Sequence, residues 1–277
     1  MIEKKTNIRD ELISSVWQTS MLMGVLNVTP DSFSDGGLYA DRTDALARAR
    51  AMVEEGASIL DIGGESTRPG STPVSEADEL NRTQQITLEL FRASHTPLSI
   101  DTYKAKVAVQ NADAGAVIIN DISGMTYDPA MAAAVAKTGS IIVVTYNRGK
   151  TREDINLVDD MRAFFDAAYA RADHAGIPKA HIWLDPGIGF AKTVAQNFQA
   201  LRRLDVICDY GSPVLVGVSR KSFIGKTLNN EVDERLPGTL AAGLYALQNG
   251  ASVLRVHDVR AHAEAIKIQQ TIDQADV

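Results

Sequence analysis

The length, composition and charge of the chain point to a globular protein. It has 277 residues, 45% of them hydrophobic and 23% charged, with a formal net charge of -7 and one cysteine. These values exclude a disordered or low-complexity polypeptide, an internal disulfide framework and nonspecific binding to nucleic acid, which requires a basic surface. No apolar run reaches the length of a membrane span and residues 1–7 lack an apolar signal core, so we expect a cytoplasmic protein with no membrane partner.

Short apolar segments alternate with amphipathic ones along the chain. We predict strands near residues 21–28, 57–63, 97–101, 116–121, 140–145, 181–185, 213–218 and 252–257. We predict helices near residues 43–55, 76–94, 104–114, 129–138, 159–175, 195–207, 238–249 and 259–274. Most of the apolar runs are continuous, which is typical of strands that are buried on both faces of a parallel sheet.

Glycine and proline positions agree with these boundaries. Glycines follow five of the predicted helices, at Gly56, Gly115, Gly139, Gly176 and Gly250. Glycine is common at this position because many helices end on a residue with left-handed backbone. None of the nine prolines falls inside a predicted helix, where proline would break the hydrogen-bond ladder.

The repeated strand–helix units predict the fold. Eight such units in about 250 residues are typical of a (β/α)8 barrel. The alternative is an open doubly wound sheet, which usually carries a G-x-G-x-x-G turn after its first strand, and residues 27–31 do not match that turn. We therefore predict an α/β fold with a single (β/α)8 TIM barrel over residues 21–277. Residues 1–20 are a short N-terminal extension that we expect to lie across the bottom of the barrel.

Polar side chains end every predicted strand, where the active sites of such barrels form. The acidic ones are Asp61, Asp101, Asp121 and Asp185, and the basic ones are Arg68, Arg220, Lys221, Arg255 and His257. Mutual ion pairs could account for any one of them, but charges inside or directly after apolar strands need a partner or a ligand. As a set they predict a substrate with an anionic part. Arginines and lysines at the ends of the last strands suit phosphate binding. Carboxylates and amides deeper in the barrel suit a flat heterocycle with N–H donors.

Other motifs are weaker. Gly225-Lys226-Thr227 resembles the end of a phosphate-binding Walker A loop, but Arg220 stands where that loop has glycine. The five histidines are scattered, which argues against a histidine-based metal cage but leaves room for Mg²⁺ shared with substrate phosphates. Cys208 lies in a helical pattern and is expected to be a packing residue.

Seven segments at the strand ends resemble the motifs of dihydropteroate synthases. They are residues 27–37, 63–70, 100–102, 119–122, 185–190, 219–222 and 255–258, in order along the chain. The resemblance implies a barrel, usually a homodimer, that condenses 6-hydroxymethyl-7,8-dihydropterin diphosphate with p-aminobenzoate. The products are 7,8-dihydropteroate, used for folate synthesis, and diphosphate. Mg²⁺ assists, and sulfonamides mimic p-aminobenzoate in this family.

The resemblance also implies roles for individual residues. Binding of pterin diphosphate is implied for Asn27, Thr67, Asp101, Asn120, Asp185, Lys221, Arg255 and His257. Binding of p-aminobenzoate is implied for Phe33, Thr67, Arg68, Pro69, Phe190, Lys221 and Ser222. Asn27 is the implied protein ligand of Mg²⁺. The implied catalytic residues are Asp101, Lys221, Arg255 and His257.

One motif departs from the family. After the fifth strand the family commonly carries Met-His, and this chain carries Thr145-Tyr146. Because that methionine packs against the pterin, we expect Thr145 to give a smaller and more polar wall and a slightly remodelled pterin pocket.

Two other functions fit part of the pattern. A pterin-binding methyltransferase that passes a methyl group to a corrinoid protein needs no diphosphate site, so residues 219–221 with Arg255 and His257 favour the synthase. A degenerate pterin-binding module would have lost some of the charged residues at the strand ends. Asp101, Asp185, Lys221 and Arg255 are all present.

Overall fold

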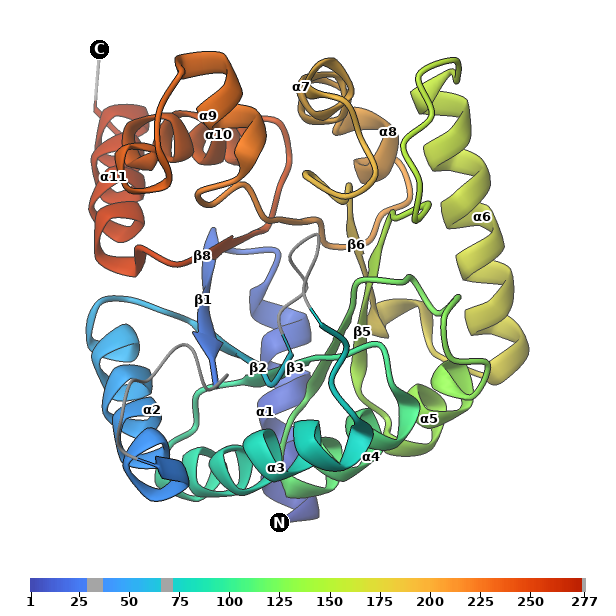
Figure 1. Ribbon diagram of the computed structural model, residues 1–277, viewed down its shortest axis with the longest axis vertical. Coiled ribbons are helices and arrows are strands. Elements are labelled where there is room, and N and C mark those ends of the chain that lie inside the picture. Colours follow the sequence, from blue (N-terminus) through green and yellow to red (C-terminus); the bar gives the residue numbers. More distant parts are fainter. Residues whose placement is uncertain (29–36, 66–71, 276–277) are drawn as a thin grey trace.

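Eight parallel strands enclose the centre of the molecule and helices surround them (Figure 1). The computed structural model describes residues 1–28, 37–65 and 72–275, with side chains from residue 42 onward in the second range. The strands are β1 Met21–Asn27, β2 Ile59–Gly63, β3 Leu98–Asp101, β4 Ile118–Asp121, β5 Ile141–Thr145, β6 Ile182–Asp185, β7 Leu215–Val216 and β8 Val253–Val256. Their order in the sheet is β6-β5-β4-β3-β2-β1-β8-β7.

The sheet closes on itself through contacts between its two edges, β6 and the segment at β7. Leu184 of β6 forms an isolated parallel bridge with Val214, the residue before β7. The Leu184 amide also donates to the carbonyl of Pro213 at 2.9 Å. The predicted (β/α)8 barrel is confirmed, with its seam between β6 and β7.

The helices follow the strands in the expected alternation. They are α1 Ile2–Ser15, α2 Gly37–Glu54, α3 Glu76–Ala93, α4 Ala105–Ala114, α5 Met131–Thr138, α6 Leu157–Ala175, α7 Val194–Arg202, α8 Asp205–Cys208, α9 Ser222–Leu228, α10 Leu236–Gln248 and α11 Val259–Asp273. Local capping explains several starts: the Ser75 hydroxyl accepts from the Asp78 amide, and Thr193 and Gln196 form a reciprocal capping box. No helix in the described part of the chain is long and apolar enough to cross a membrane.

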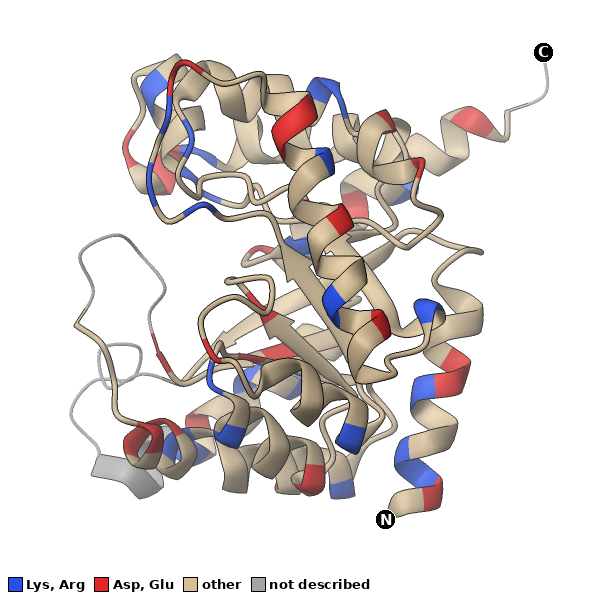
Figure 2. Cartoon of the chain, turned by 90° about the vertical axis from the view of Figure 1, so that its right-hand side faces the viewer, with Lys and Arg blue, Asp and Glu red and all other residues tan. Residues whose placement is uncertain are grey.

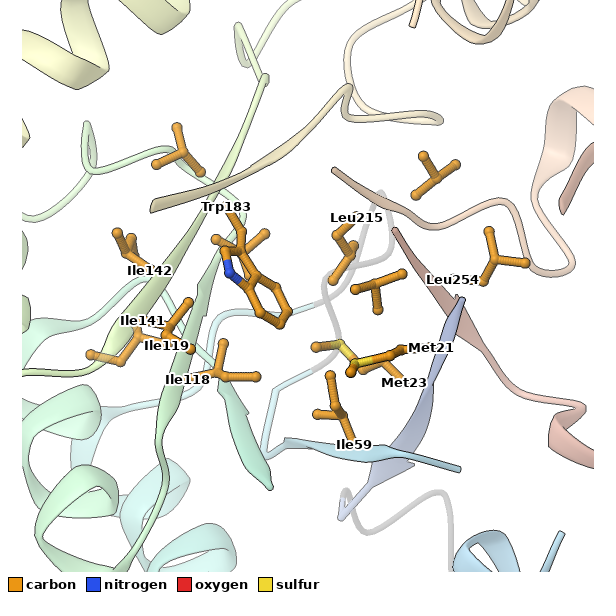
Figure 3. Packing of buried hydrophobic residues seen from close by; sticks show 14 of the residues in the cluster. Met21, Met23, Ile59, Ile118, Ile119, Ile141, Ile142, Trp183, Leu215 and Leu254 are labelled. Carbon is orange, nitrogen blue, oxygen red and sulfur yellow. The ribbon is translucent and has the colours of Figure 1, made fainter. Parts of the chain in front are cut away.

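The core lies inside the barrel and between the strands and helices. Met23, Ile59, Trp183 and Leu215 point toward one another in the space that the strands enclose (Figure 3), and all four are fully buried. Burial of such a side chain contributes about 1.5–3 kcal/mol. Because the opposite strand face packs on helices, the apolar runs are continuous rather than alternating.

All five glycines predicted to end helices have positive φ angles. At Gly115, where φ is +126°, space is limiting as well, because a Cβ would lie 2.2 Å from Cγ of Phe91. Only glycine fits such a position without strain. The prediction of these helix ends is confirmed.

The structure differs from the sequence prediction around the seventh strand. β7 covers only two residues, and residues 217–221 leave the sheet to form a turn and then α9, which was not predicted. The predicted helix over 195–207 is two helices, α7 and α8. Residues 218–221 form a turn, closed by the hydrogen bond from the Lys221 amide to the Val218 carbonyl, that leads directly into α9.

The helix α1 packs on the amino-terminal side of the strands. Ile8 and Leu12 join the hydrophobic core, Lys4 Nζ donates to the Phe91 carbonyl at 2.6 Å, and Arg9 Nη1 donates to the Gly139 carbonyl at 2.9 Å. Phe91 and Gly139 precede β3 and β5, so α1 lies at the end opposite the polar strand ends.

Candidate active site

The carboxyl ends of the strands bring the predicted polar residues together. The strand register places Asn27, Gly63, Asp101 and Asn120 in one row across β1 to β4. Gly63 keeps this row open: a Cβ there would lie 3.4 Å from Asn27 Oδ1 and 3.8 Å from Asp101 Cβ. Figure 2 shows acidic residues among the strands at the centre, in addition to the charges of both signs on the helices.

Arg255 is the centre of the charged network. From β8, its Nε contacts Asp61 Oδ2 at 2.6 Å and its Nη2 contacts Asp101 Oδ2 at 2.7 Å. The Asn120 amide donates to the same Asp61 oxygen at 3.0 Å. The guanidinium therefore links β8 to β2 and β3 with two charge-assisted hydrogen bonds, a geometry that its planar fork allows.

The ionisation of this network is strongly perturbed. Burial raises the pKa of Asp101 to about 7, with Asp61 adding to the rise and Arg255 opposing it. Burial alone would lower the pKa of Arg255, but Asp61 and Asp101 outweigh it and raise that pKa. Burial also raises the pKa of Asp185. Buried ionisable groups with pKa values shifted in this way are typical of a functional site.

Three buried polar atoms at the barrel mouth lack hydrogen-bond partners among the described residues. They are Asp61 Oδ1, Asp101 Oδ1 and Thr145 Oγ1. An unsatisfied buried polar group costs about 1–3 kcal/mol. A ligand with N–H groups would satisfy the two carboxylate oxygens, which is what a flat nitrogen heterocycle supplies.

Lys221 belongs to the segment that follows β7, and its side chain contacts the segment that follows β6. Its Nζ donates to the Ile188 carbonyl and stands 4.9 Å from the centroid of the Phe190 ring. Burial lowers the pKa of Lys221 to about 8, and Asp185 opposes this. A cation thus sits next to an aromatic wall, at the same end of the barrel as Arg255.

His257 follows β8 directly and is held by Ser219. The Ser219 hydroxyl lies 2.9 Å from His257 Nδ1 and accepts from the His257 amide at 3.2 Å. Arg220 differs from the expectation that it faces an anionic ligand, since its guanidinium makes two hydrogen bonds to Asp258, at 2.6 and 3.0 Å.

The residues predicted for p-aminobenzoate are only partly visible. Phe190 is half-buried beside Lys221, and Ser222 is the first residue of α9 and is exposed. Phe33, Thr67, Arg68 and Pro69 lie outside the described residues. The three described residues of this set, Phe190, Lys221 and Ser222, therefore lie in the segments that follow β6 and β7.

The end of β5 carries the departure noted in the sequence. Thr145 is buried and in register with Asp185 on β6, two residues beyond Val143, which is the β5 residue in register with Asn120. Tyr146 is also buried, and its hydroxyl and Arg148 both bond to Asp160. The tyrosine is thus held within a polar cluster of its own, and the remodelled pterin pocket stays a prediction.

Sequence reasoning missed Lys192, which holds the segment after β6. Its Nζ donates to the carbonyls of Tyr146, Gly187 and Phe190 at 3.2, 2.9 and 3.2 Å and lies 4.2 Å from the Tyr146 ring centroid. Burial lowers the pKa of Lys192 to about 7. Its place two residues after Phe190 was the only available signal.

A second lysine missed from sequence is Lys104, which follows β3. It contacts Glu65 and, at 2.5 Å, Glu79, and its Nζ also donates to the Val74 carbonyl at 2.7 Å. Because its partners come from α3 and from the segment between β2 and α3, no local pattern could identify it. Lys104 fixes Glu65 and Val74, which flank residues 66–71 in the sequence.

The described residues offer few ligands for a metal. No group of three or more His, Cys, Asp or Glu among them could hold an ion. Asn27 Oδ1 does point beside Gly63 toward the row of site residues. An amide oxygen with substrate oxygens and water fits Mg²⁺, which is usually bound by one or two protein groups and by phosphates.

Comparison with known proteins gives consistent matches. The profile of the family described as pterin binding enzyme matches residues 23–257. The dihydropteroate synthase of Synechocystis sp. is 46% identical over 258 residues, which cover 91% of this chain and 89% of that protein.

Solved structures are similar as well. The dihydropteroate synthase of Clostridium difficile, determined in the presence of pteroic acid, superposes with a TM-score of 0.89 at 40% identity, covering 93% of this chain and 98% of that chain. The dihydropteroate synthase of Xanthomonas albilineans with 4-aminobenzoic acid has a TM-score of 0.89 at 40% identity and covers 94% and 95%.

Proposed function

Because the chain belongs to the dihydropteroate synthase family, we propose that it condenses 6-hydroxymethyl-7,8-dihydropterin diphosphate with p-aminobenzoate to give 7,8-dihydropteroate and diphosphate. The observation that carries the proposal is the Arg255 network, in which buried Asp61 and Asp101 each keep one oxygen without a partner among the described residues. That arrangement suits a nitrogen heterocycle bound next to a cation. Related structures contain pteroic acid or 4-aminobenzoic acid.

The pterin ring is proposed to bind deep in the mouth. Asp101 and Asn120 lie on the neighbouring strands β3 and β4, and Asp185 ends β6; they supply acceptors and an amide, and Lys221 lies near Asp185. Their positions on rigid strands fix the ring before reaction, so the reacting CH₂ group is held in one orientation.

The reaction exchanges one bond for another. The bond between the pterin CH₂ carbon and the diphosphate oxygen breaks, and both electrons leave with the diphosphate. The amine lone pair of p-aminobenzoate forms the new C–N bond, and the amine nitrogen then gives up a proton to solvent. Because the amine is itself the nucleophile, the protein needs no reactive serine or cysteine.

The proposed role of the charged residues is electrostatic. Arg255, His257 and Lys221 stabilise negative charge on the departing diphosphate, and the Asp101 carboxylate stabilises positive charge that develops on the pterin. Such preorganised groups typically contribute 10²–10³-fold in rate each. We propose Asn27 as the protein ligand of a Mg²⁺ ion, which when bound supplies further charge neutralisation at the diphosphate.

The p-aminobenzoate pocket is proposed to combine two groups of residues. Phe190, Lys221 and Ser222 form its described side, with an aromatic face, a cation and a hydroxyl. Phe33, Thr67, Arg68 and Pro69 are proposed for the other side. An aromatic wall and a cation suit a flat ring with a carboxylate.

We further propose that two copies form a homodimer in the cytoplasm. A groove of about 410 Å³ between α7, α9 and α10 is lined mostly by apolar side chains. Phe198, Leu228 and Tyr245 in this lining are 43%, 49% and 42% exposed. Exposed apolar patches of this kind mark contact surfaces, and a second copy is the occupant that the family resemblance implies.

The activity is tested with the purified chain. Incubation with pterin diphosphate, labelled p-aminobenzoate and Mg²⁺ is expected to give labelled dihydropteroate and diphosphate in equal amounts. The same pterin without its diphosphate is the control and should give none. Absence of product across pH 6 to 9 and a range of Mg²⁺ concentrations would overturn the proposal, and methyl transfer to a corrinoid would then favour the methyltransferase.

A further inference from the structure

The turn between β7 and α9 contains a strained arginine. The Lys221 amide donates to the Val218 carbonyl at 3.2 Å, and Arg220, the third residue of this turn, has a φ of +57°. A turn with positive φ at its third position normally carries glycine or asparagine. Strain of this kind persists where the surrounding structure enforces it, often at functional sites.

The residues around Arg220 hold its backbone in this conformation. Its guanidinium donates two hydrogen bonds to the Asp258 carboxylate, at 2.6 and 3.0 Å. Its amide donates to the hydroxyl of fully buried Thr239 at 3.1 Å, and its carbonyl accepts from Arg235 Nη1 at 3.0 Å. Side chain and backbone are thus fixed from α10, from the segment before α10 and from the segment after β8.

The residues on either side of this pair belong to the proposed site. Ser219 and Lys221 flank Arg220, and Asp258 follows His257. Ser219 bonds to His257 at 2.9 Å, so two consecutive side-chain links join the turn after β7 to the segment after β8. The backbone pairing of β7 with β8 ends at Leu215–Val253 and Val216–Leu254, and the two side-chain links continue the connection beyond it.

We propose that Arg220 and Asp258 are a positioning pair that sets the separation of Lys221 and His257 and so matches these two side chains to the diphosphate of the substrate. Arg220 itself points to Asp258 and does not contact the ligand. The inference rests on the proposed function for its substrate, but binding of inorganic diphosphate tests it without any turnover.

The test is a double-mutant cycle on diphosphate affinity. The variants are Arg220→Gly, which suits the backbone of the turn and removes the pair, Asp258→Asn and the double variant. The dissociation constant of inorganic diphosphate, measured by calorimetry with Mg²⁺ present, is expected to rise at least tenfold in each. Because both substitutions break one link, the double variant should bind about as weakly as either single variant.

Kinetics separate positioning from a general loss of structure. The KM for pterin diphosphate is expected to rise and kcat to fall, so that kcat/KM drops at least tenfold, because the displaced groups bind the diphosphate less tightly before and during its departure. Arg220→Lys should restore part of the loss because it keeps one charged hydrogen bond. A matched control is Arg203→Gln, which breaks the exposed Arg203–Asp205 pair at the end of α7 and should leave both constants unchanged.

Two outcomes would overturn the proposal. If Asp258→Asn binds diphosphate within twofold of the unchanged protein while Arg220→Gly does not, Arg220 contacts the ligand directly. If the variants lower only the melting temperature and leave the diphosphate affinity unchanged, the pair is structural. Failure of the unchanged protein to make dihydropteroate would count against the proposed function and would leave the binding cycle interpretable.

Discussion

Asp101 and Lys221 have opposite charges, and their pKa values are shifted in opposite directions. Burial raises the pKa of Asp101 to about 7 and lowers the pKa of Lys221 to about 8. The proposed electrostatic roles require Asp101 without its proton and Lys221 with one. Asp101 gains a proton as the pH falls through 7, and Lys221 loses one as the pH rises through 8, so the two requirements overlap only in a narrow range.

This overlap predicts a bell-shaped pH dependence. For the pterin diphosphate, kcat/KM measured from pH 5 to 10 is expected to have an acid limb near 7 and an alkaline limb near 8. Asp101→Asn should lower kcat/KM about 10²-fold and remove the acid limb, since the amide does not titrate. Lys221→Arg should move the alkaline limb upward. An acid limb that persists in Asp101→Asn would assign it to another group or to the substrate.

Thr145 gives a second prediction about a single residue. Its buried hydroxyl lacks a partner among the described residues and lies in register with Asp185. If the hydroxyl contacts the pterin, Thr145→Met should change pterin diphosphate affinity several-fold, because the larger apolar side chain fills the wall and removes the polar group. Thr145→Val is the matched control for the hydroxyl alone. Unchanged affinity in both variants would show that this wall does not contact the pterin.

The elements were predictable to the extent that their signals are local. Continuous apolar runs and glycines at helix ends identified the eight strands and most helices, because burial on both faces and left-handed backbone both leave a mark in the sequence. The two-residue length of β7 and the presence of α9 depend on a turn stabilised by Thr239, Arg235 and Asp258. Contacts so distant in sequence leave no local pattern.

The residues of the candidate site also divide into those that the sequence could identify and those that it could not. Asp101, Asn120, Asp185 and Arg255 could be identified because a polar residue interrupts or ends an apolar run. Lys104 and Lys192 could not, because lysine is usually exposed and only the folded chain shows the carboxylates and carbonyls around them.

The segment after β6 contains a strained position that can be relieved. Ala191 has a φ of +45°, in the left-handed region that costs a residue with a Cβ about 1–2 kcal/mol. Ala191→Gly is expected to stabilise the protein by up to about 1 kcal/mol, since the gain exceeds the entropy lost to a more flexible unfolded chain. Chemical denaturation measures it.

A control separates this effect from alanine-to-glycine changes in general. Ala136→Gly, inside α5, should destabilise by about 1 kcal/mol because glycine is unfavourable in a helix interior. If both substitutions destabilise by the same amount, the backbone at Ala191 is not a source of strain.

At the scale of the whole molecule, the net charge of -7 hides an uneven distribution. Charges of both signs cover the helices (Figure 2), and the mouth of the barrel gathers Asp61, Asp101 and Asp185 with Arg255 and Lys221. The groove between α7, α9 and α10 is by contrast apolar. Charge is thus concentrated where an anionic substrate is proposed to bind and is scarce where a second copy is proposed to pack.

The proposed dimer has a direct test. Leu228→Glu places a charge in the groove and should convert a dimer into a monomer at micromolar concentration, as measured by light scattering after size-exclusion chromatography. Ile268→Glu is the control, because Ile268 is 63% exposed on α11 and does not line the groove. A monomer in the unchanged protein, or a dimer that survives Leu228→Glu, would rule out this surface as the interface.

The seam of the barrel has a consequence for the motions of the protein. The Leu184–Val214 bridge and the Leu184–Pro213 hydrogen bond join the two edges of the sheet next to Asp185, which ends β6. When these contacts open, the Asp185 carboxylate and the Lys221 ammonium move apart. A ligand that contacts both Asp185 and Lys221 binds the barrel only while β6 and β7 are joined. Its binding free energy therefore stabilises the contact between these two strands. The Leu184 amide hydrogen should then exchange with solvent more slowly when a ligand is bound at the mouth, because the ligand adds a connection between β6 and the segment after β7.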